Sequence, residues 1–289
     1  MLPPEILSTI FGLVQEEILC AALYGAVNPD SRRYNRWTTV LRICRRWREV
    51  GFATPSLWKT VFVVFIPREP PCFNAEAHLQ RSAACPLRVF IDSWASRNTI
   101  FKVLCQLPRI RELTLDQQTN GLLTLPMMFS RPGPALEVLT LLGGMGRVSE
   151  SVPKLFSRVL PHLPALALSR YSRFTVYTLP NLKHLHVHRC TVKSVRAMES
   201  LLEFLANTPA LEDLKFTAPH FCSYLTPTEL QLRTQVDLPR LRRLAFVQHA
   251  SFPRTFLGRL RLPTGVALDR KSTRLNSSHS GESRMPSSA

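Results

Sequence analysis

The chain has 289 residues, 45% of them hydrophobic, so it can bury a sizeable core and is not broadly disordered. It carries 37 Lys and Arg residues against 20 acidic ones, a formal net charge of +17. Such an excess is typical of proteins that bind nucleic acid, acidic proteins or anionic membranes. The basic residues occur mostly in ones and twos rather than in a tail. We therefore favour a solvated basic surface over a nucleic-acid groove.

The lack of a recognisable signal peptide or membrane span, together with the cysteine usage, predicts a soluble protein of the cytoplasm or nucleus. Glu5 lies where a signal peptide would be basic, and apolar runs such as VFVVFI at 61–66 are far too short to cross a bilayer. The seven cysteines form no CxxC pair, and those in ILCAAL and VLCQL have apolar neighbours. These features predict buried, reduced thiols and no membrane partner.

The first sixty residues predict a small helical domain. In LPPEILSTIFGLV, prolines precede the helix and Glu5 lies in its first turn, where a negative charge suits the helix dipole. A polar loop is expected at 28–36. Helical spacing resumes from Trp37 to Val50, and Thr54-Pro55 ends it. Trp37, Trp47 and Trp58 suggest a compact three-helix core, or an apolar surface that meets a partner.

These residues carry a resemblance to a known family. The pattern LPPEIL…IF, a spacer, then V..IC..W..V….P.LW over residues 2–58 resembles the F-box-like domain of mushroom-type fungi, although its middle segment is longer. The resemblance implies docking to the Skp-type adaptor of a cullin–RING ubiquitin ligase. The positions that it implies for the adaptor contact and its supporting core are Leu2, Pro3, Pro4, Ile6, Leu7, Ile10, Phe11, Val40, Cys44 and Trp47.

The rest of the chain repeats a short pattern, Pro-x-Leu-x-x-Leu-x-apolar. Clear copies start at 108, 180, 209 and 239, and a near match starts at Pro134. Weaker copies start at 55, 85 and 164. The spacing of 29 and 30 residues between the last three clear copies is close to that of leucine-rich repeats. The interval of 46 residues between 134 and 180 predicts a unit that is short, degenerate or partly missing.

Helix-like stretches at 100–107, 152–160 and 198–207 lie between these copies. A short strand, a loop and a helix per unit predict an α/β repeat in which parallel strands stack into a horseshoe-like leucine-rich-repeat solenoid. The expected domains are therefore a helical F-box-like domain at 1–60 and a solenoid at 61–269. The segment 77–91 also resembles the linker that follows the F-box in the fungal group.

The stretch KHLHVHRC at 183–190 contains possible metal ligands, because three histidines alternate and a cysteine follows. The repeat pattern LxxLxLxx(N/C) instead places Leu185, Val187 and Cys190 inward. His184, His186 and His188 then lie on the concave surface. We therefore expect no metal and no cofactor, and favour a partner-binding surface, which histidines could make pH-sensitive.

Basic side chains are expected beside the histidines on the concave surface. They favour an acidic or phosphorylated protein substrate, although they could equally serve only to keep an exposed sheet soluble. The expected substrate-binding residues are His184, His186, His188, Lys215, Arg240, Arg242 and Arg243.

The last twenty residues, 270–289, differ from the rest. They are rich in Ser, lack an apolar period and resemble a translated sequencing adapter, so we expect a non-native, disordered tail. Without this tail, which holds four basic residues and one acidic residue, the net charge is +14.

Signatures of catalysis are missing from the sequence. It has no GxxxxGK[ST], GxGxxG, HExxH or GxSxG motif, so we assign no catalytic residue. The sequence predicts a non-enzymatic substrate receptor of an SCF-type (cullin–RING) ubiquitin ligase. The alternatives are a repeat scaffold that assembles no ligase, a basic nucleic-acid-binding protein and, last, a metal-dependent enzyme.

Overall fold

The computed structural model describes residues 2–24, 36–63, 75–92, 95–117, 136–143, 149–152, 155–156, 160–175, 177–221, 235–247 and 254–271. The expected polar loop, except for Arg36, and the tail from residue 272 onward lie outside these residues. The unit expected between 134 and 180 is described only in part.

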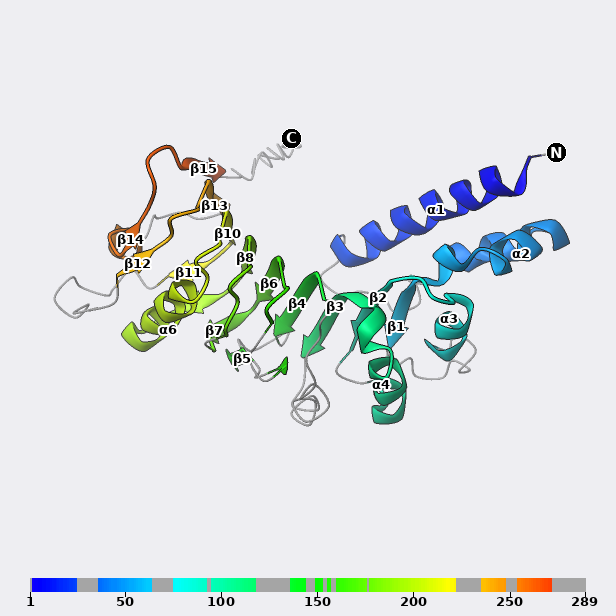
Figure 1. The fold of residues 1–289 in the computed structure, drawn as a ribbon, viewed down its shortest axis with the longest axis horizontal. Coiled ribbons are helices and arrows are strands. Elements are labelled where there is room, and N and C mark those ends of the chain that lie inside the picture. The colour runs from blue at the N-terminus through cyan, green and yellow to red at the C-terminus, as the bar shows by residue number, and fades with distance from the viewer. Residues whose placement is uncertain are drawn as a thin grey trace, which may run out of the picture.

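A nine-stranded parallel sheet dominates the structure (Figure 1). Its strands lie side by side in the order in which they occur along the chain. Its strands are β1 (Thr60–Val63), β2 (Leu87–Ile91), β3 (Ile110–Gln117), β4 (Val138–Gly143), β6 (Ala165–Ser169), β8 (His184–His188), β10 (Asp213–Thr217), β13 (Arg243–Val247) and β15 (Ala267–Lys271). The predicted α/β class with parallel strands is confirmed. All eight copies of the sequence pattern lead into a strand, including the three weak ones.

The register of these strands explains why the repeated leucines matter. Equivalent residues of neighbouring strands pair directly, so each leucine of the pattern stacks on the same position of the next unit. One such row across the first eight strands of the sheet is Val61, Val89, Leu113, Leu139, Leu166, Leu185, Leu214 and Leu244. Every side chain in this row is at most 5% exposed. Burying each one stabilises the fold by about 1.5–3 kcal/mol.

Helices cover the face to which these rows point. This face, the convex one in Figure 1, has α4 (Arg97–Leu104) and α6 (Val195–Ala206) packed on it, with α3 (Ala75–Arg81) beside β1. Ile100 and Leu201 enter the same apolar core as the strand leucines. The helices predicted at 100–107 and 198–207 are confirmed, whereas the one predicted at 152–160 lies partly outside the described residues.

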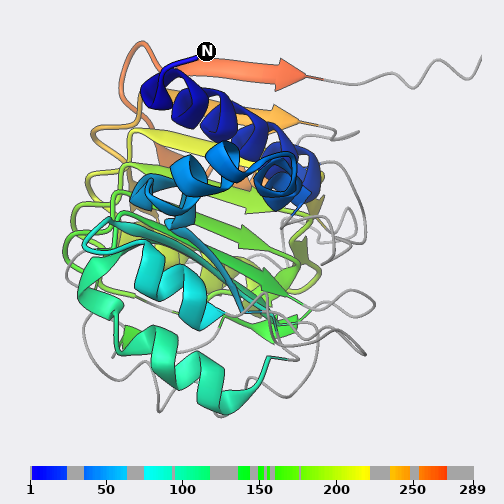
Figure 2. The ribbon, with the colours of Figure 1, turned by 90° about the vertical axis from the view of Figure 1, so that its right-hand side faces the viewer.

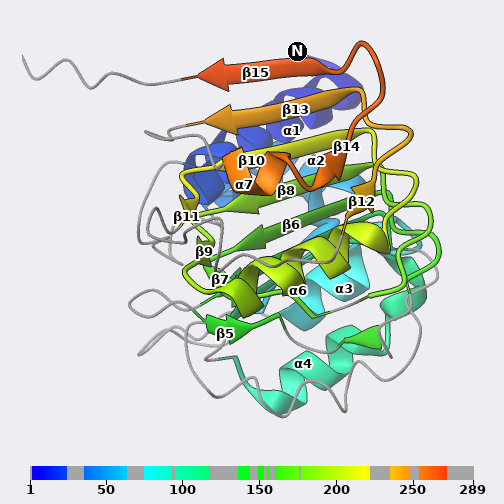
Figure 3. The same ribbon diagram turned by 90° about the vertical axis from the view of Figure 1, so that its left-hand side faces the viewer.

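Several short elements accompany the large sheet: short strands, which Figure 3 shows on the convex side, a one-turn helix and a 3-10 turn. Three parallel pairs join neighbouring units. They are β5 (Ser149–Ser151) with β7 (Tyr171–Arg173), β9 (Thr191–Val192) with β11 (His220–Phe221), and β12 (Val236–Asp237) with β14 (Leu260–Arg261). The helix is α7 (Arg254–Leu257), and the turn is η5 (Leu107–Arg109). Between β6 and β8 the described residues contain no helix, which makes this unit short, as expected.

Three consecutive units leave the sheet through the same turn. Arg170, Arg189 and Ala218 directly follow β6, β8 and β10, and all three adopt a left-handed backbone with φ between 45° and 64°. Each donates its N–H to the carbonyl that ends the next strand, for example Arg189 to Thr217 at 2.8 Å. Non-glycine residues rarely adopt this conformation, so its recurrence is independent evidence that these units repeat one structure.

The N-terminal residues form a separate small core. It is built by α1 (Pro4–Tyr24), η2 (Arg36–Arg42), α2 (Arg45–Phe52) and η3 (Pro55–Trp58). Trp37 and Trp58 contact edge to face at 5.1 Å between ring centroids, and both are almost fully buried. The expected compact core that holds tryptophan rings is therefore present. The rest of this core is Leu7, Phe11, Leu41 and Leu57.

Three details differ from expectation. The helical stretch expected from Trp37 to Val50 is broken at Cys44, whose backbone is extended. The part before Cys44 is a 3-10 helix rather than an α-helix. The run Thr38-Thr39-Val40 explains the 3-10 helix, since β-branched residues weaken an α-helix. Cys44 and Cys105 are exposed, not buried as expected, because each lies at a helix end. Cys190 is buried, and all three residues are free thiols. Strand β15 includes Arg270 and Lys271, two residues beyond the expected domain boundary.

Candidate protein-interaction surfaces

Helix α1 carries large apolar side chains on two faces. Leu7 and Phe11 point into the small core and are 2% and 0% exposed. Ile6, Ile10 and Leu13 are 47%, 38% and 68% exposed, and their spacing places them together on another side of the helix; Leu2, which is 51% exposed, lies just before the helix begins. We call these four residues the outer stripe. Contiguous exposed apolar side chains are typical of interaction sites.

The structure separates the predicted adaptor residues into two groups. Leu7 and Phe11 are buried, and Val40 and Trp47 pack against the small core, as in the 5.2 Å contact between Phe11 and Trp47. These four residues support the domain rather than offer a surface. Six are exposed: Leu2, Pro3, Pro4, Ile6, Ile10 and Cys44.

The prediction from sequence omitted two exposed apolar residues of this unit, Leu13 and Ile43, which is 62% exposed. Leu13 could have been identified from its spacing, because it follows Ile10 by three residues on the same helix face. Ile43 lies at the break between η2 and α2, which helical periodicity did not reveal.

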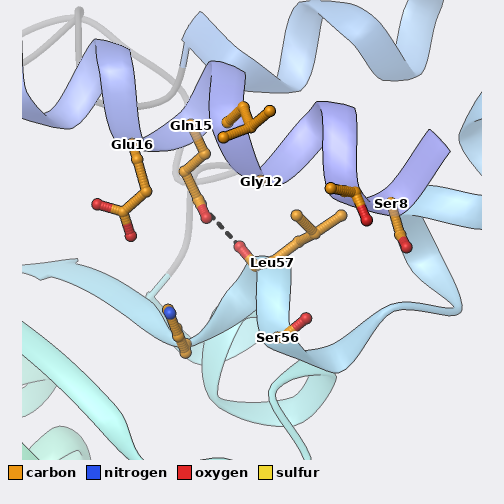
Figure 4. A pocket seen from close by; sticks show the side chains of 9 residues that line it. Ser8, Gly12, Gln15, Glu16, Ser56 and Leu57 are labelled. Atoms are coloured by element: carbon orange, nitrogen blue, oxygen red, sulfur yellow. Dashed lines mark hydrogen bonds between the residues drawn. The ribbon is translucent and has the colours of Figure 1, made fainter. Parts of the chain in front are cut away.

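Polar contacts hold α1 in place from its inner side. The Gln15 amide donates to the Leu57 carbonyl at 2.8 Å, and Ser56 and Glu16 lie on either side of that bond (Figure 4). These residues border a hollow of about 320 Å³ between α1 and η3, open beside Gly12. Glu16 also pairs with Arg88 of β2 at 3.4 Å. Helix α1 is thus fixed to the sheet while its outer stripe stays exposed.

The second candidate surface is the face of the sheet opposite α4 and α6, which we call the open face. Figure 2 shows the molecule from the side on which α1 lies. Strand alternation places His184, His186, His188, Lys215 and Arg243 on the open face. Arg240 and Arg242 precede β13 rather than lying within it, so strand alternation does not place them on this face.

Acidic partners reduce the positive charge of this region. Arg243 pairs with Asp269 of β15 at 3.0 Å, and Arg242 lies 4.0 Å from Glu212, which also pairs with Lys183. On β2, Arg88 forms two hydrogen bonds with Glu112. On the open face itself, the Arg243–Asp269 and Arg88–Glu112 pairs offset part of the positive charge, which favours a partner of mixed charge over a strongly acidic one.

Two of the three histidines are held by hydroxyl groups. His186 Nε2 hydrogen-bonds Thr217 Oγ1 at 2.9 Å, and His188 Nδ1 hydrogen-bonds Ser169 Oγ at 3.1 Å. Burial lowers the pKa of His186, and burial together with the Arg189 charge lowers the pKa of His188 to about 4. His188 therefore stays neutral near neutral pH, so the expected pH sensitivity is wrong for this residue.

The motif KHLHVHRC divides between two faces of the sheet, as the repeat pattern predicted. Cys190 is 1% exposed, and its thiol donates to the carbonyl of Leu168 at 3.7 Å. Burial raises the pKa of this thiol to about 11, so it remains protonated and is a poor metal ligand. Across the part of the chain that the structure describes, no group of three His, Cys, Asp or Glu side chains could hold a metal.

Small side chains create a hollow of about 190 Å³ in the middle of the open face. Ala165 and Ala167 of β6, His184 and His186 of β8, and Lys215 of β10 are among the residues that line it. Its size suits a single side chain of a bound protein. Three of the predicted substrate-binding residues, His184, His186 and Lys215, thus line one recess.

Comparison of the chain with protein-family models, with curated proteins and with solved structures found no match. Among the described residues, no helix is long and apolar enough to cross a membrane.

Proposed function

We propose that this protein is a substrate receptor of an SCF-type ubiquitin ligase, with an F-box-like N-terminal unit and a leucine-rich-repeat solenoid. In this proposal the outer stripe of α1 docks a Skp-type adaptor, and the open face of the sheet holds a protein substrate. Support for the solenoid comes from strands that pair in chain order and from rows of stacked leucines. The chain itself performs no chemistry.

The observation that carries the proposal is the outer stripe. Four large apolar side chains, three on α1 and one just before it, stay between 38% and 68% exposed although another face of the helix is already packed. Full burial of a side chain of this kind is worth about 1.5–3 kcal/mol, so covering the stripe with an adaptor would stabilise a complex. The stripe also includes Leu2, Ile6 and Ile10, which the F-box resemblance had assigned to the adaptor contact and its supporting core.

The way α1 is attached to the sheet supports a role in positioning. The Glu16–Arg88 pair and the Gln15–Leu57 hydrogen bond connect α1 to η3 and to the open side of β2. A substrate on the open face would therefore be held at a set distance from the adaptor. Such proximity raises the effective concentration of substrate lysines near a ubiquitin-loaded enzyme.

Adaptor binding by purified variants tests this proposal. Ile6→Asp and Leu13→Asp place charges in the outer stripe and are expected to weaken binding to a Skp-type adaptor at least tenfold, measured by calorimetry or co-purification. Phe101→Asp is the matched control, since Phe101 is 60% exposed but lies on α4. Failure of the unmodified protein to bind any Skp-type adaptor, or equal binding by all three variants, would overturn the proposal.

A further inference from the structure

A hollow of about 210 Å³ lies between the N-terminal helices and α3, away from the outer stripe and the open face. Its lining residues come from four elements: η2, α2 and η3 of the N-terminal unit, and α3. We call it the arginine pocket. The residues used below are Arg42, Arg48, Arg81, Phe52, Trp58 and His78.

Two of the three arginines are held in place by contacts that leave donors available. Arg48 Nε donates to the Leu41 carbonyl at 3.2 Å, which uses one of its five N–H groups. The Arg81 guanidinium stacks over Phe52 at 4.5 Å and over Trp58 at 4.4 Å from the ring centroids, a contact that needs no hydrogen bond. The pocket is therefore partly organised before any ligand binds.

The wall behind these arginines is rigid and uncharged. The Trp58 indole N–H donates to the Gly51 carbonyl at 2.9 Å, and its ring meets His78 at 5.0 Å. His78 is 5% exposed and its Nδ1 bonds the Thr60 carbonyl at 2.8 Å, so this nitrogen carries the proton. Burial also lowers the pKa of His78 to about 4, so the three guanidinium groups are the charged groups that line the pocket near neutral pH.

No acidic side chain lines the pocket. The nearest carboxylates in sequence have other partners: Glu49 pairs with Arg45 at 2.8 Å, and Glu76 pairs with Lys102. Within the described residues, none of the three pocket arginines forms an ion pair. Because a guanidinium does not deprotonate in proteins, three like charges persist here at any physiological pH. An anion that enters the pocket would therefore meet three positive charges and no negative one.

We propose that the arginine pocket binds a phosphate group, either free phosphate or a phosphate monoester. A phosphate carries close to two negative charges at neutral pH and offers several acceptor oxygens, so it matches three guanidinium groups better than a single carboxylate does. Arginine in particular suits phosphate because its planar N–H groups bind two oxygens at once. This inference does not depend on the proposed ligase function.

Thermal unfolding of the whole chain, followed by circular dichroism, tests the site with two probes: inorganic phosphate and O-phosphoserine. Sodium chloride at equal ionic strength and unmodified serine are the reference solutes. Both phosphates are expected to raise the Tm above these references, since a ligand that binds only the folded state stabilises it by mass action. A response to phosphoserine alone points to an ester ligand, and a response to inorganic phosphate alone points to the free ion; either supports the site.

Arg42→Gln and Arg48→Gln should each weaken phosphate affinity about tenfold, measured by titration calorimetry, because each removes a charge-assisted hydrogen bond. Arg45→Gln is the matched control: it lies on the same helix as Arg48, its side chain is 91% exposed, and it does not line the pocket. Two results overturn the inference. One is a Tm rise in the unmodified protein no larger than that from chloride, and the other is an equal phosphate response in all three variants.

Discussion

Helices α1 and α6 differ in where their apolar side chains go. In α6, Met198, Leu201, Leu202 and Leu205 are at most 2% exposed, and the other side of the helix carries polar residues such as Glu203. In α1, Leu7 and Phe11 are equally buried, yet the outer stripe is also apolar. A helix that packs on one surface needs one apolar face. The second apolar face of α1 thus suggests a second surface, which is the basis of the proposed docking role.

The two regions also differ in the size of their cores. The strands and the helices on the convex face share one long apolar cluster, whereas the N-terminal helices rest on six buried residues. Trp58 and His78 meet where the two regions join. Substitutions should therefore have clearly different effects in the two regions.

The largest expected effect separates the two helices directly. Leu201→Ala leaves a cavity in the core under α6, where Leu201 is 0% exposed, and should lower the free energy of unfolding by about 2–5 kcal/mol. Ile6→Ala in the outer stripe should change it by only about 0.5 kcal/mol. Urea unfolding measures both. A comparable loss in Ile6→Ala would mean that the stripe supports the fold rather than a partner.

The junction between the regions should make stability depend on pH. Burial lowers the pKa of His78 to about 4, from an ordinary value of 6.5. As the pH falls, His78 is therefore protonated at a higher pH in the unfolded chain than in the folded chain. The free energy of unfolding should then decrease as the pH drops from about 6.5 towards 4. Between about pH 7 and pH 5, the wild type should lose about 2 kcal/mol more unfolding free energy than His78→Gln. Parallel pH profiles for the two proteins would contradict this assignment.

Two glycines provide a matched pair in the N-terminal region. A Cβ at Gly51 of α2 would overlap the buried Leu41 side chain, so Gly51→Ala should destabilise by about 1–3 kcal/mol. Nothing lies within 4 Å of a Cβ at Gly12 of α1, so Gly12→Ala should stabilise by up to about 1 kcal/mol. Thermal unfolding compares them. The opposite order would show that α1 packs more tightly than α2 at these positions.

The smallest effect concerns the link between α1 and the sheet. Glu16→Gln removes an ion pair with Arg88 in which both side chains are partly exposed, so the loss of stability should be at most about 1 kcal/mol. Arg88 keeps its two hydrogen bonds with Glu112. A larger loss in urea unfolding would show that this contact, rather than the small core, fixes α1 to the sheet.

The sequence predicted most of the sheet because its signal is local. The spacing of Leu182, Leu185 and Val187 within one unit sets which side chains point inward, and the same spacing recurs in the other units. Strand β15 was missed because its segment, LPTGVALDRK, has Gly265 where other units have the first leucine of the pattern. The same periodicity correctly placed His184, His186 and His188 on the open face.

The interaction surfaces were only partly predictable. Periodicity identified the apolar residues of α1 but could not separate Leu7 from Ile6, since either helix face could have been the packed one. Arg240 and Arg242 show that a basic run near a strand can begin before the strand does. The ion pairs that offset charge on the open face join different strands, such as Arg243 with Asp269, and no local pattern reveals them.

By itself, the sequence determined the parallel strands, the buried leucine rows and the inward position of Cys190. These follow from residue spacing, because a strand alternates its side chains and a stacked unit must bury its apolar side. Tertiary structure alone decided which face of α1 remains exposed, how far the pKa of His188 falls, and that Arg42, Arg48 and Arg81 line one pocket. Burial and charge at these sites depend on segments far apart in the chain, which only folding brings together.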